Sequence, residues 1–189
     1  MRRVAVILGF CTVLVACTAR SNSSTALFAT LNSAAEPFRA AFNRQRDRVR
    51  VVELVSPTCP LCLEGVSKIQ RALFESEPSA KLAGFAIWVP MLSGNASNVP
   101  DAMTLAPDAR VSHYWDESND LGIAYERVLP VSSGPAWDVY MLYAPGIVWN
   151  AVDPPKPSFW MHQLAIKNAP HLDATVFADH ARAMLANAH

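Results

Sequence analysis

The chain of 189 residues is long enough for one domain with a sizeable hydrophobic core, and 51% of its residues are hydrophobic. Lysine plus arginine and aspartate plus glutamate both total 16, so the formal net charge at pH 7 is zero. This composition excludes bulk disorder. A chain without a basic excess also lacks the electrostatic field that attracts nucleic acid, so we expect no nucleic-acid partner.

The N-terminal segment has the layout of a secretory signal. Two arginines precede an apolar run, Val4 to Ala16, that is shorter than the ~20 residues of a membrane-spanning helix. The end of this run, Leu14-Val15-Ala16-Cys17, resembles the bacterial lipobox, in which cleavage precedes a lipid-carrying cysteine. An ordinary secretory signal and an uncleaved membrane helix are the alternatives.

The lipobox resemblance implies a processed and anchored protein. We expect a signal peptide over 1–16, lipid on Cys17, and a small, polar tether over 17–33. Two or more acyl chains would hold the protein firmly to a bilayer. In this export class an aspartate after the cysteine retains the protein at the inner membrane, and Thr18 stands there instead. The resemblance therefore implies the outer membrane, with the domain facing the periplasm.

The first elements after the tether are a helix, a strand and a second helix. The spacing of apolar residues predicts a short helix over about 35–47, and the nearly continuous apolar run over 48–55 predicts a strand buried on both faces. Helical spacing then relates four residues: Cys62, Val66, Ile69 and Leu73. Pro60 suits the first turn of a helix, which places Cys59 at the N-terminus of this one.

The remaining segments continue an alternating pattern. Residues 81–92 predict a second buried strand, parallel to the first because a helix joins the two. Residues 93–107 predict a loop, and two helices are expected over 106–129, the first carrying Val111, Tyr114 and Trp115 on one side.

The C-terminal third predicts a hairpin and a last helix. Strands over 136–144 and 147–150 are expected to pair through the turn at Pro145 and Gly146, with a loop over 153–163. The final helix, over 173–188, is expected to direct four side chains inward: Val176, Phe177, His180 and Met184. Six aromatic side chains are interpreted as core or hairpin packing rather than as a groove for polypeptides: Trp115, Trp137, Tyr140, Tyr143, Trp149 and Trp160.

Cysteine usage narrows the chemistry. Of the four cysteines, Cys11 leaves with the signal and Cys17 carries lipid, so Cys59 and Cys62 remain. A disulfide scaffold needs several spread-out bridges, and a four-cysteine zinc site needs a second pair. A thiolate is the attacking species in disulfide exchange, and a helix N-terminus stabilises it. Cys59 is then the nucleophile, and Cys62, one turn further, is the resolving thiol.

The order of strand, cysteine-pair helix, strand, helix, hairpin and helix resembles the thioredoxin superfamily over roughly 51–188. The resemblance is carried by "CPLC" after a strand and by "GPAWDVYMLYAPG", placed where that fold has a cis-proline followed by its hairpin. It implies a single α/β domain over 34–189, a three-layer α/β/α sandwich with a central mixed sheet. The sheet would end in a C-terminal hairpin before the final helix, with an insertion around 93–107 between the cysteine-pair helix and the cis-proline.

The same resemblance implies two further site residues. Pro135 would face the disulfide and orient the backbone of the substrate. Glu53, six positions before Cys59, would be the buried acid that accepts or delivers the proton of the second cysteine. A solvated or salt-bridged strand residue is the alternative for Glu53, although an unpaired carboxylate in an apolar strand needs a reason to be there.

The predicted function is an extracytoplasmic, lipid-anchored thiol–disulfide oxidoreductase. It would act as a monomer on protein clients, together with a redox partner, and would need no dissociable cofactor. Two alternatives stay open: a copper-binding chaperone of this fold, with His113, His162 or His171 as a third ligand, and a redox-silent interaction module. Thr58 replaces the usual tryptophan before the first cysteine, so the direction of electron flow is undetermined.

Overall fold

The computed structural model describes residues 27–78, 80–131 and 134–187. The signal peptide, the lipid-bearing Cys17 and most of the expected tether lie outside these residues. Within the described part of the chain, no helix is both long enough and apolar enough to cross a membrane.

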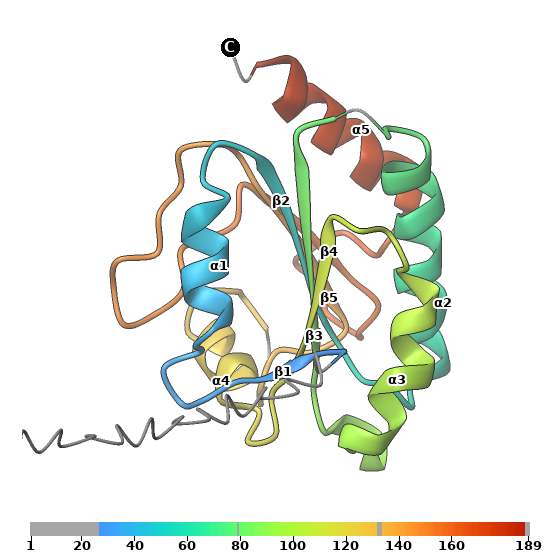
Figure 1. Cartoon of the computed structure of the whole chain (residues 1–189), viewed down its shortest axis with the longest axis vertical. Helices are drawn as coiled ribbons and strands as arrows, with labels where there is room; N and C mark the ends of the chain where they lie inside the picture. Colours follow the sequence, from blue (N-terminus) through green and yellow to red (C-terminus); the bar gives the residue numbers. More distant parts are fainter. Residues whose placement is uncertain (1–26, 79, 132–133, 188–189) are drawn as a thin grey trace, which may run out of the picture.

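A mixed six-stranded sheet forms the centre of the domain, in the order β1-β4-β3-β2-β5-β6 (Figure 1). Strands β1, β4, β3 and β2 run parallel to one another, whereas β5 pairs antiparallel with β2 and β6 pairs antiparallel with β5. The strands are β1 (Ala29–Thr30), β2 (Val49–Val55), β3 (Leu82–Trp88), β4 (Val111–Trp115), β5 (Val139–Tyr143) and β6 (Phe159–His162).

Helices cover both faces of this sheet, which confirms the predicted three-layer α/β/α architecture (Figure 1). One face carries α1 (Phe38–Arg44) and α4 (Asp120–Glu126). The other carries α2 (Pro60–Ile69), α3 (Val99–Ala102) and α5 (Ala174–Ala186), and α2 continues into a π-helical stretch, Gln70–Glu75. Each face has its own hydrophobic core, because the apolar side chains of the central strands alternate between the two sides.

The unit β2-α2-β3 confirms the central prediction from the sequence. Strands β2 and β3 are buried along their whole length and pair in parallel, Val49 with Leu82 through to Val55 with Trp88. The stripe of Cys62, Val66, Ile69 and Leu73 is fully buried against the sheet. A helix joins two parallel strands here because a parallel pair needs a crossover connection.

Residues 111–115 were expected to be helical, and this prediction is wrong. They form β4, which pairs in parallel with β3. The register runs from Gly84 opposite Val111 to Trp88 opposite Trp115. A spacing of three and four residues in so short a segment fits a helix or a strand, and valine and aromatic residues pack well on a sheet. The following helix, expected in the same region, is present as α4.

The hairpin partner of β5 also differs from the prediction. It is β6 (Phe159–His162), from the segment expected to be a loop, and not residues 147–150. The chain between the two strands instead lies over the α1 face, where the buried Arg50 guanidinium donates to the carbonyls of Ala144 and Ile147 at 2.7 Å each. Trp149 packs there against Phe38, with ring centroids 5.9 Å apart.

Three smaller expectations need correction. Residues 29–30, within the expected tether, form β1 on the edge of β4, so the sheet starts earlier than predicted. The expected loop over 93–107 contains α3 and short 3₁₀ turns (Ala96–Asn98 and Met103–Leu105). The inward face of α5 is made by Phe177, Ala178 and Ala181, whereas Val176 is 41% exposed and His180 is exposed, stacked on Phe159.

Candidate functional site

Cys59 and Cys62 lie at the N-terminus of α2, as predicted. Cys59 is the N-cap, with extended backbone angles, and its sulfur accepts a hydrogen bond from the Cys62 amide at 3.4 Å. Pro60 occupies the first helical position, where its missing N–H has no partner to lose. A sulfur in this place faces free amide groups and the positive end of the helix dipole, which both stabilise a thiolate.

The surroundings of the two sulfurs differ. Cys59 retains 5% of its surface exposed, and Cys62 is completely buried. Burial, with the nearby Asp138 carboxylate as the next cause, raises the pKa of the Cys62 thiol far above its ordinary value. Cys62 is therefore held as a neutral thiol and needs a proton acceptor before it can attack, whereas Cys59 is the sulfur that a partner reaches first.

A loop after β3 supports the segment that leads into α2. The Ser56 hydroxyl donates to the Met91 carbonyl at 2.7 Å, and the Thr58 hydroxyl donates to the Leu92 carbonyl at 3.0 Å. This contact places the exposed side chain of Leu92 in the loop that flanks Thr58, and Leu61 in the first turn of α2 is exposed as well. Their exposed fractions, 57% and 51%, give the rim near Cys59 an apolar character.

Glu53 lies on the same face of the sheet as the cysteines. Its neighbours in alternation, Val51 and Val55, belong to the core under α2, and Glu53 stands opposite Tyr140 in the β2–β5 ladder. The side chain is 4% exposed, and burial raises its pKa from 4.5 to about 8. Among the described residues it makes no salt bridge, so the alternative of a solvated or paired strand carboxylate does not hold.

The structure places Asp138 beside the two sulfurs. One carboxylate oxygen of Asp138 and the two sulfurs of Cys59 and Cys62 all lie within 4.8 Å of one another. Asp138 directly precedes β5. Pro135 lies three residues before Asp138. Its peptide bond with Gly134 is not among the cis bonds of the described residues, so the expectation of a cis-proline at this position is wrong. An orienting role of Pro135 stays a prediction.

The sequence analysis did not single out Asp138, although an acidic residue directly before an apolar strand is a visible feature. Acidic residues are common in turns, so this position did not stand out as functional. The structure adds what the sequence lacks: Asp138 is 2% exposed and has a φ of 51°, in the left-handed region. Strained backbone and a buried acid at one position point to function.

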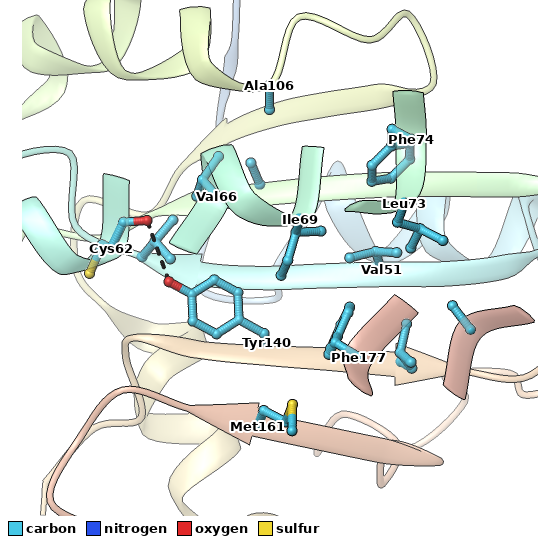
Figure 2. Packing of buried hydrophobic residues seen from close by; sticks show 14 of the residues in the cluster. Val51, Cys62, Val66, Ile69, Leu73, Phe74, Ala106, Tyr140, Met161 and Phe177 are labelled. Carbon is cyan, nitrogen blue, oxygen red and sulfur yellow. Dashed lines mark hydrogen bonds between the residues drawn. The ribbon is translucent and has the colours of Figure 1, made fainter. Parts of the chain in front are cut away.

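The Tyr140 side chain connects these groups beneath α2. Figure 2 shows its ring under the helix, with the hydroxyl directed toward the backbone carbonyl of Cys62. The same hydroxyl lies 2.9 Å from Asp138 Oδ1 and 2.8 Å from Gln163 Oε1. Tyr140 is completely buried, so these polar atoms are the ones that satisfy it.

The three histidines do not complete a ligand set with the cysteines. His162 uses both ring nitrogens, accepting from the Leu164 amide at 3.0 Å and donating to the Ala169 carbonyl at 3.1 Å. His113 lies beside Trp88 and Ala106, and burial lowers its pKa. His171 is exposed, with its ring 5.8 Å from that of His162. In the described residues, the third ligand-type group near the sulfurs is the carboxylate of Asp138.

A hollow of about 930 Å³ lies elsewhere, along β1 and β4. It is lined by Leu27, Phe28, His113 and Tyr114 among others, and neither cysteine borders it. The other aromatic side chains that the sequence singled out are largely core: Trp115, Tyr140, Tyr143 and Trp149 are buried, as predicted.

Comparison with known proteins supports the fold. No protein-family model and no curated protein sequence matches the chain. Among solved structures, it is similar to a thiol:disulfide interchange protein of the thioredoxin family from Chlorobium tepidum, at 14% identity and a TM-score of 0.50, over 84% of this chain and 92% of that one. A thioredoxin-like protein solved in its oxidized form is 12% identical, also with a TM-score of 0.50, over 74% and 79% of the two chains.

A third structure is a secreted disulfide oxidoreductase from Mycobacterium tuberculosis, described as homologous to the E. coli protein DsbE. It is 13% identical, with a TM-score of 0.48, over 83% of this chain and 96% of that one. The chain described here thus has a thioredoxin-like fold, with a Cys-X-X-Cys pair at the N-terminus of the helix that follows a central strand.

Proposed function

We propose that this protein is a thiol–disulfide oxidoreductase that exchanges disulfides with protein partners through Cys59 and Cys62. The observation that carries the proposal is the Cys59 sulfur at the N-terminus of α2, with the Cys62 sulfur within 4.8 Å of it. The similar solved structure that is named a thiol:disulfide interchange protein supports the same chemistry. The reaction needs no cofactor beyond the two sulfurs.

The proposed exchange follows from the difference between the two sulfurs. The Cys59 thiolate attacks a client disulfide, forms a mixed disulfide, and releases one client thiolate. Cys62 then loses its proton and attacks the Cys59 sulfur, which closes the Cys59–Cys62 disulfide and releases the second client thiolate. Two electrons pass to the client. The reverse sequence oxidises a client dithiol, and the site geometry serves both directions.

The rim near Cys59 fits a polypeptide client. Leu61 and Leu92 expose apolar surface there, and the loop contact of Thr58 with Leu92 fixes that side of the rim. Exposed large apolar side chains beside a reactive group are typical of surfaces that contact protein segments. Pro135 would orient the client backbone from the segment before β5, and the protein would act as a monomer.

The location proposed for this activity is the cell envelope. The Leu14-Val15-Ala16-Cys17 quartet supports export, cleavage before Cys17 and lipid attachment, and Thr18 supports the outer membrane facing the periplasm. An oxidising compartment of this kind is where protein disulfides form and persist, so clients would be present there.

A trapping experiment tests the proposed activity. Because Cys62 resolves the mixed disulfide, the Cys62→Ser variant should accumulate covalent adducts with periplasmic proteins that reductant releases. Cys59→Ser should accumulate none, and it serves as the matched control. A wild-type protein that never forms the Cys59–Cys62 disulfide in a glutathione redox buffer would contradict the proposal. Stoichiometric zinc or copper in protein purified without chelator would favour a metal site of Cys59, Cys62 and Asp138 instead.

A further inference from the structure

Asp138, Tyr140 and Gln163 form a proton network that has two satisfied arrangements. The Tyr140 hydroxyl has one hydrogen to donate, yet Asp138 Oδ1 and Gln163 Oε1 lie 2.9 and 2.8 Å from it, closer than the Cys62 carbonyl oxygen at 3.4 Å. One of these two neighbours must therefore supply a hydrogen to the Tyr140 oxygen. Asp138 does so when it is protonated, and Gln163 does so when its amide turns its NH₂ group toward Tyr140.

The two arrangements differ by one proton on Asp138. In the first, the Asp138 carboxylic acid donates to Tyr140, and Tyr140 donates to the Gln163 oxygen. In the second, the Gln163 amide donates to Tyr140, and Tyr140 donates to the Asp138 carboxylate. Asp138 can therefore gain or lose a proton in a buried site without leaving a polar atom unpaired, which is otherwise costly.

The position of Asp138 makes this proton useful. Its carboxylate oxygen lies within 4.8 Å of both sulfurs, and Cys62 is the buried thiol that must be deprotonated. In the described residues Asp138 has no ion-pair partner that would fix it as a carboxylate. Burial raises the pKa of Asp138, which brings proton uptake closer to neutral pH.

We propose that Asp138 is the group that takes up and returns the proton of the dithiol. The Tyr140 hydroxyl and the Gln163 amide change the direction of their hydrogen bonds to match each protonation state of Asp138. This inference rests on the proposed thiol–disulfide exchange. In the resolving step the Asp138 carboxylate takes the Cys62 proton, the Cys62 thiolate bonds to the Cys59 sulfur, and the bond between Cys59 and the client breaks. The Asp138 acid then gives its proton to the departing client thiolate, so protons and electrons balance.

Other titratable groups face the same site from each neighbouring element. They are Cys59 and Cys62 from α2, Glu53 from β2, Tyr140 from β5, His162 from β6 and His171 from the segment before α5. Glu53 is the competing acid, because it lies on the same face opposite Tyr140. The experiment must therefore separate Asp138 from Glu53.

The test uses an aromatic disulfide, 5,5′-dithiobis(2-nitrobenzoate), in less than stoichiometric amount. Attack by Cys59 releases the first coloured thiolate, and attack by Cys62 on the resulting mixed disulfide releases the second, so rapid mixing separates the two steps. The coloured thiolate is a weak base that leaves without a proton. The second phase therefore reports the deprotonation and attack of Cys62.

For Asp138→Asn we expect the second phase to slow about 100-fold at neutral pH, the lower end of general-base contributions, with the first phase changed less than about threefold. The direction of the effect separates a base from a mere charge. The negative charge of Asp138 raises the pKa of Cys62, so removing a purely electrostatic neighbour would speed the second phase. An unchanged or faster second phase therefore overturns the proposal.

The pH profile and two further variants complete the test. The wild-type second phase should rise with pH and level off as Asp138 loses its proton, whereas Asp138→Asn should keep rising. Tyr140→Phe removes the donor to the carboxylate, so the levelling should move to higher pH. Asp116→Asn is the matched control, since Asp116 is also buried but its carboxylate oxygens accept hydrogen bonds from the amides of Asp120 and Leu121. It should leave the second phase unchanged.

Failure of this inference can be told from failure of the proposed function. A wild-type protein that releases only the first coloured thiolate has no resolving step, and the proposed function fails. A wild-type protein that releases both, with Asp138→Asn alike in rate and pH profile, leaves the function standing and overturns the role of Asp138. If Glu53→Gln alone slows the second phase, Glu53 is the base.

Discussion

Glu53 is a single residue whose burial sets how stability depends on pH. Its pKa is 4.5 in an ordinary environment and about 8 in the folded protein. Between these two values the folded state binds more protons than the unfolded state, so the free energy of unfolding falls as pH rises through this window. Below about pH 4.5 and above about pH 8 this residue adds no further slope.

The Glu53→Gln variant removes this titration. We expect its free energy of unfolding, relative to wild type, to increase from about pH 5 to about pH 8 and then to level off, because only wild type must ionise a buried carboxylate. Urea unfolding at several pH values measures the difference. Asp116 and Asp138 titrate in both proteins, so their contributions to the free energy of unfolding cancel in the difference. A difference that stays constant across this window would show that Glu53 ionises as easily in the folded state as in the unfolded state.

At this scale the sequence identified some site residues and missed others. Cys59, Cys62 and Glu53 could be predicted because each follows from a local pattern: the pair spacing, the helix start, and an acid in an apolar strand. Asp138 could not, because its importance depends on the approach of β5 to α2, which brings residues 76 positions apart into one cluster. The resemblance to thioredoxins implied Pro135 for orienting the substrate and Glu53 for the proton, and it implied no role for Asp138.

Helix α2 depends on one glycine for its close approach to β5. A side-chain carbon at Gly65 would overlap the Tyr140 hydroxyl and the Gln163 amide oxygen. Glycine inside a helix is normally less stable than alanine by about 0.5–1 kcal/mol. Its presence here is explained by the need to bring the polar network directly under the helix.

Gly65→Ala should therefore destabilise the protein by about 1–3 kcal/mol, contrary to the usual helix preference, because the core must shift to make room. Urea unfolding measures this, with Ser67→Ala on the same helix as a control expected to change stability by less than about 1 kcal/mol. Adding Tyr140→Phe should recover part of the loss, so the double variant should lose less than the sum of the two single variants. A stabilised Gly65→Ala protein would contradict the close packing.

The strands that the sequence misplaced, β4 and β6, are short and lie away from the centre of the sheet. Residues 111–115 and 159–162 contain aromatic residues and histidine in patterns that fit several structures. Their strand state depends on a free hydrogen-bonding edge, offered by β3 in one case and β5 in the other. Residues 147–150 do not pair with β5. The buried Arg50 guanidinium donates to the carbonyls of Ala144 and Ile147 and holds this part of the chain over the α1 face of the sheet.

At the scale of the whole molecule, a domain built on a six-stranded sheet follows an N-terminal segment whose sequence has the layout of a secretory signal. We expect the mature protein to begin at Cys17, with acyl chains on that residue. Mass spectrometry of protein extracted from bacterial membranes tests this, since a lipidated Cys17 adds the mass of its acyl chains to the N-terminal peptide. The Cys17→Ser variant should appear in the soluble fraction with its dithiol chemistry intact.

A mature N-terminus elsewhere, or an unmodified Cys17, would contradict lipid attachment while leaving the activity of the domain untouched. The site lies on β2, α2 and β5, in the middle of the sheet, whereas β1, the described strand nearest to Cys17 in sequence, lies at one edge. We therefore expect the proposed lipid attachment and the proposed dithiol chemistry to be separable.

The sequence by itself determined the thioredoxin-like core: two buried strands, the helix between them, and a cysteine pair at the start of that helix. These features are local, because each depends on residue spacing within one segment. Only the tertiary structure decided the edges of the sheet and the partner of the dithiol. Strand pairing and the Asp138–Tyr140–Gln163 network join residues distant in sequence, and their energies depend on burial and hydrogen bonding that exist only after the chain has folded.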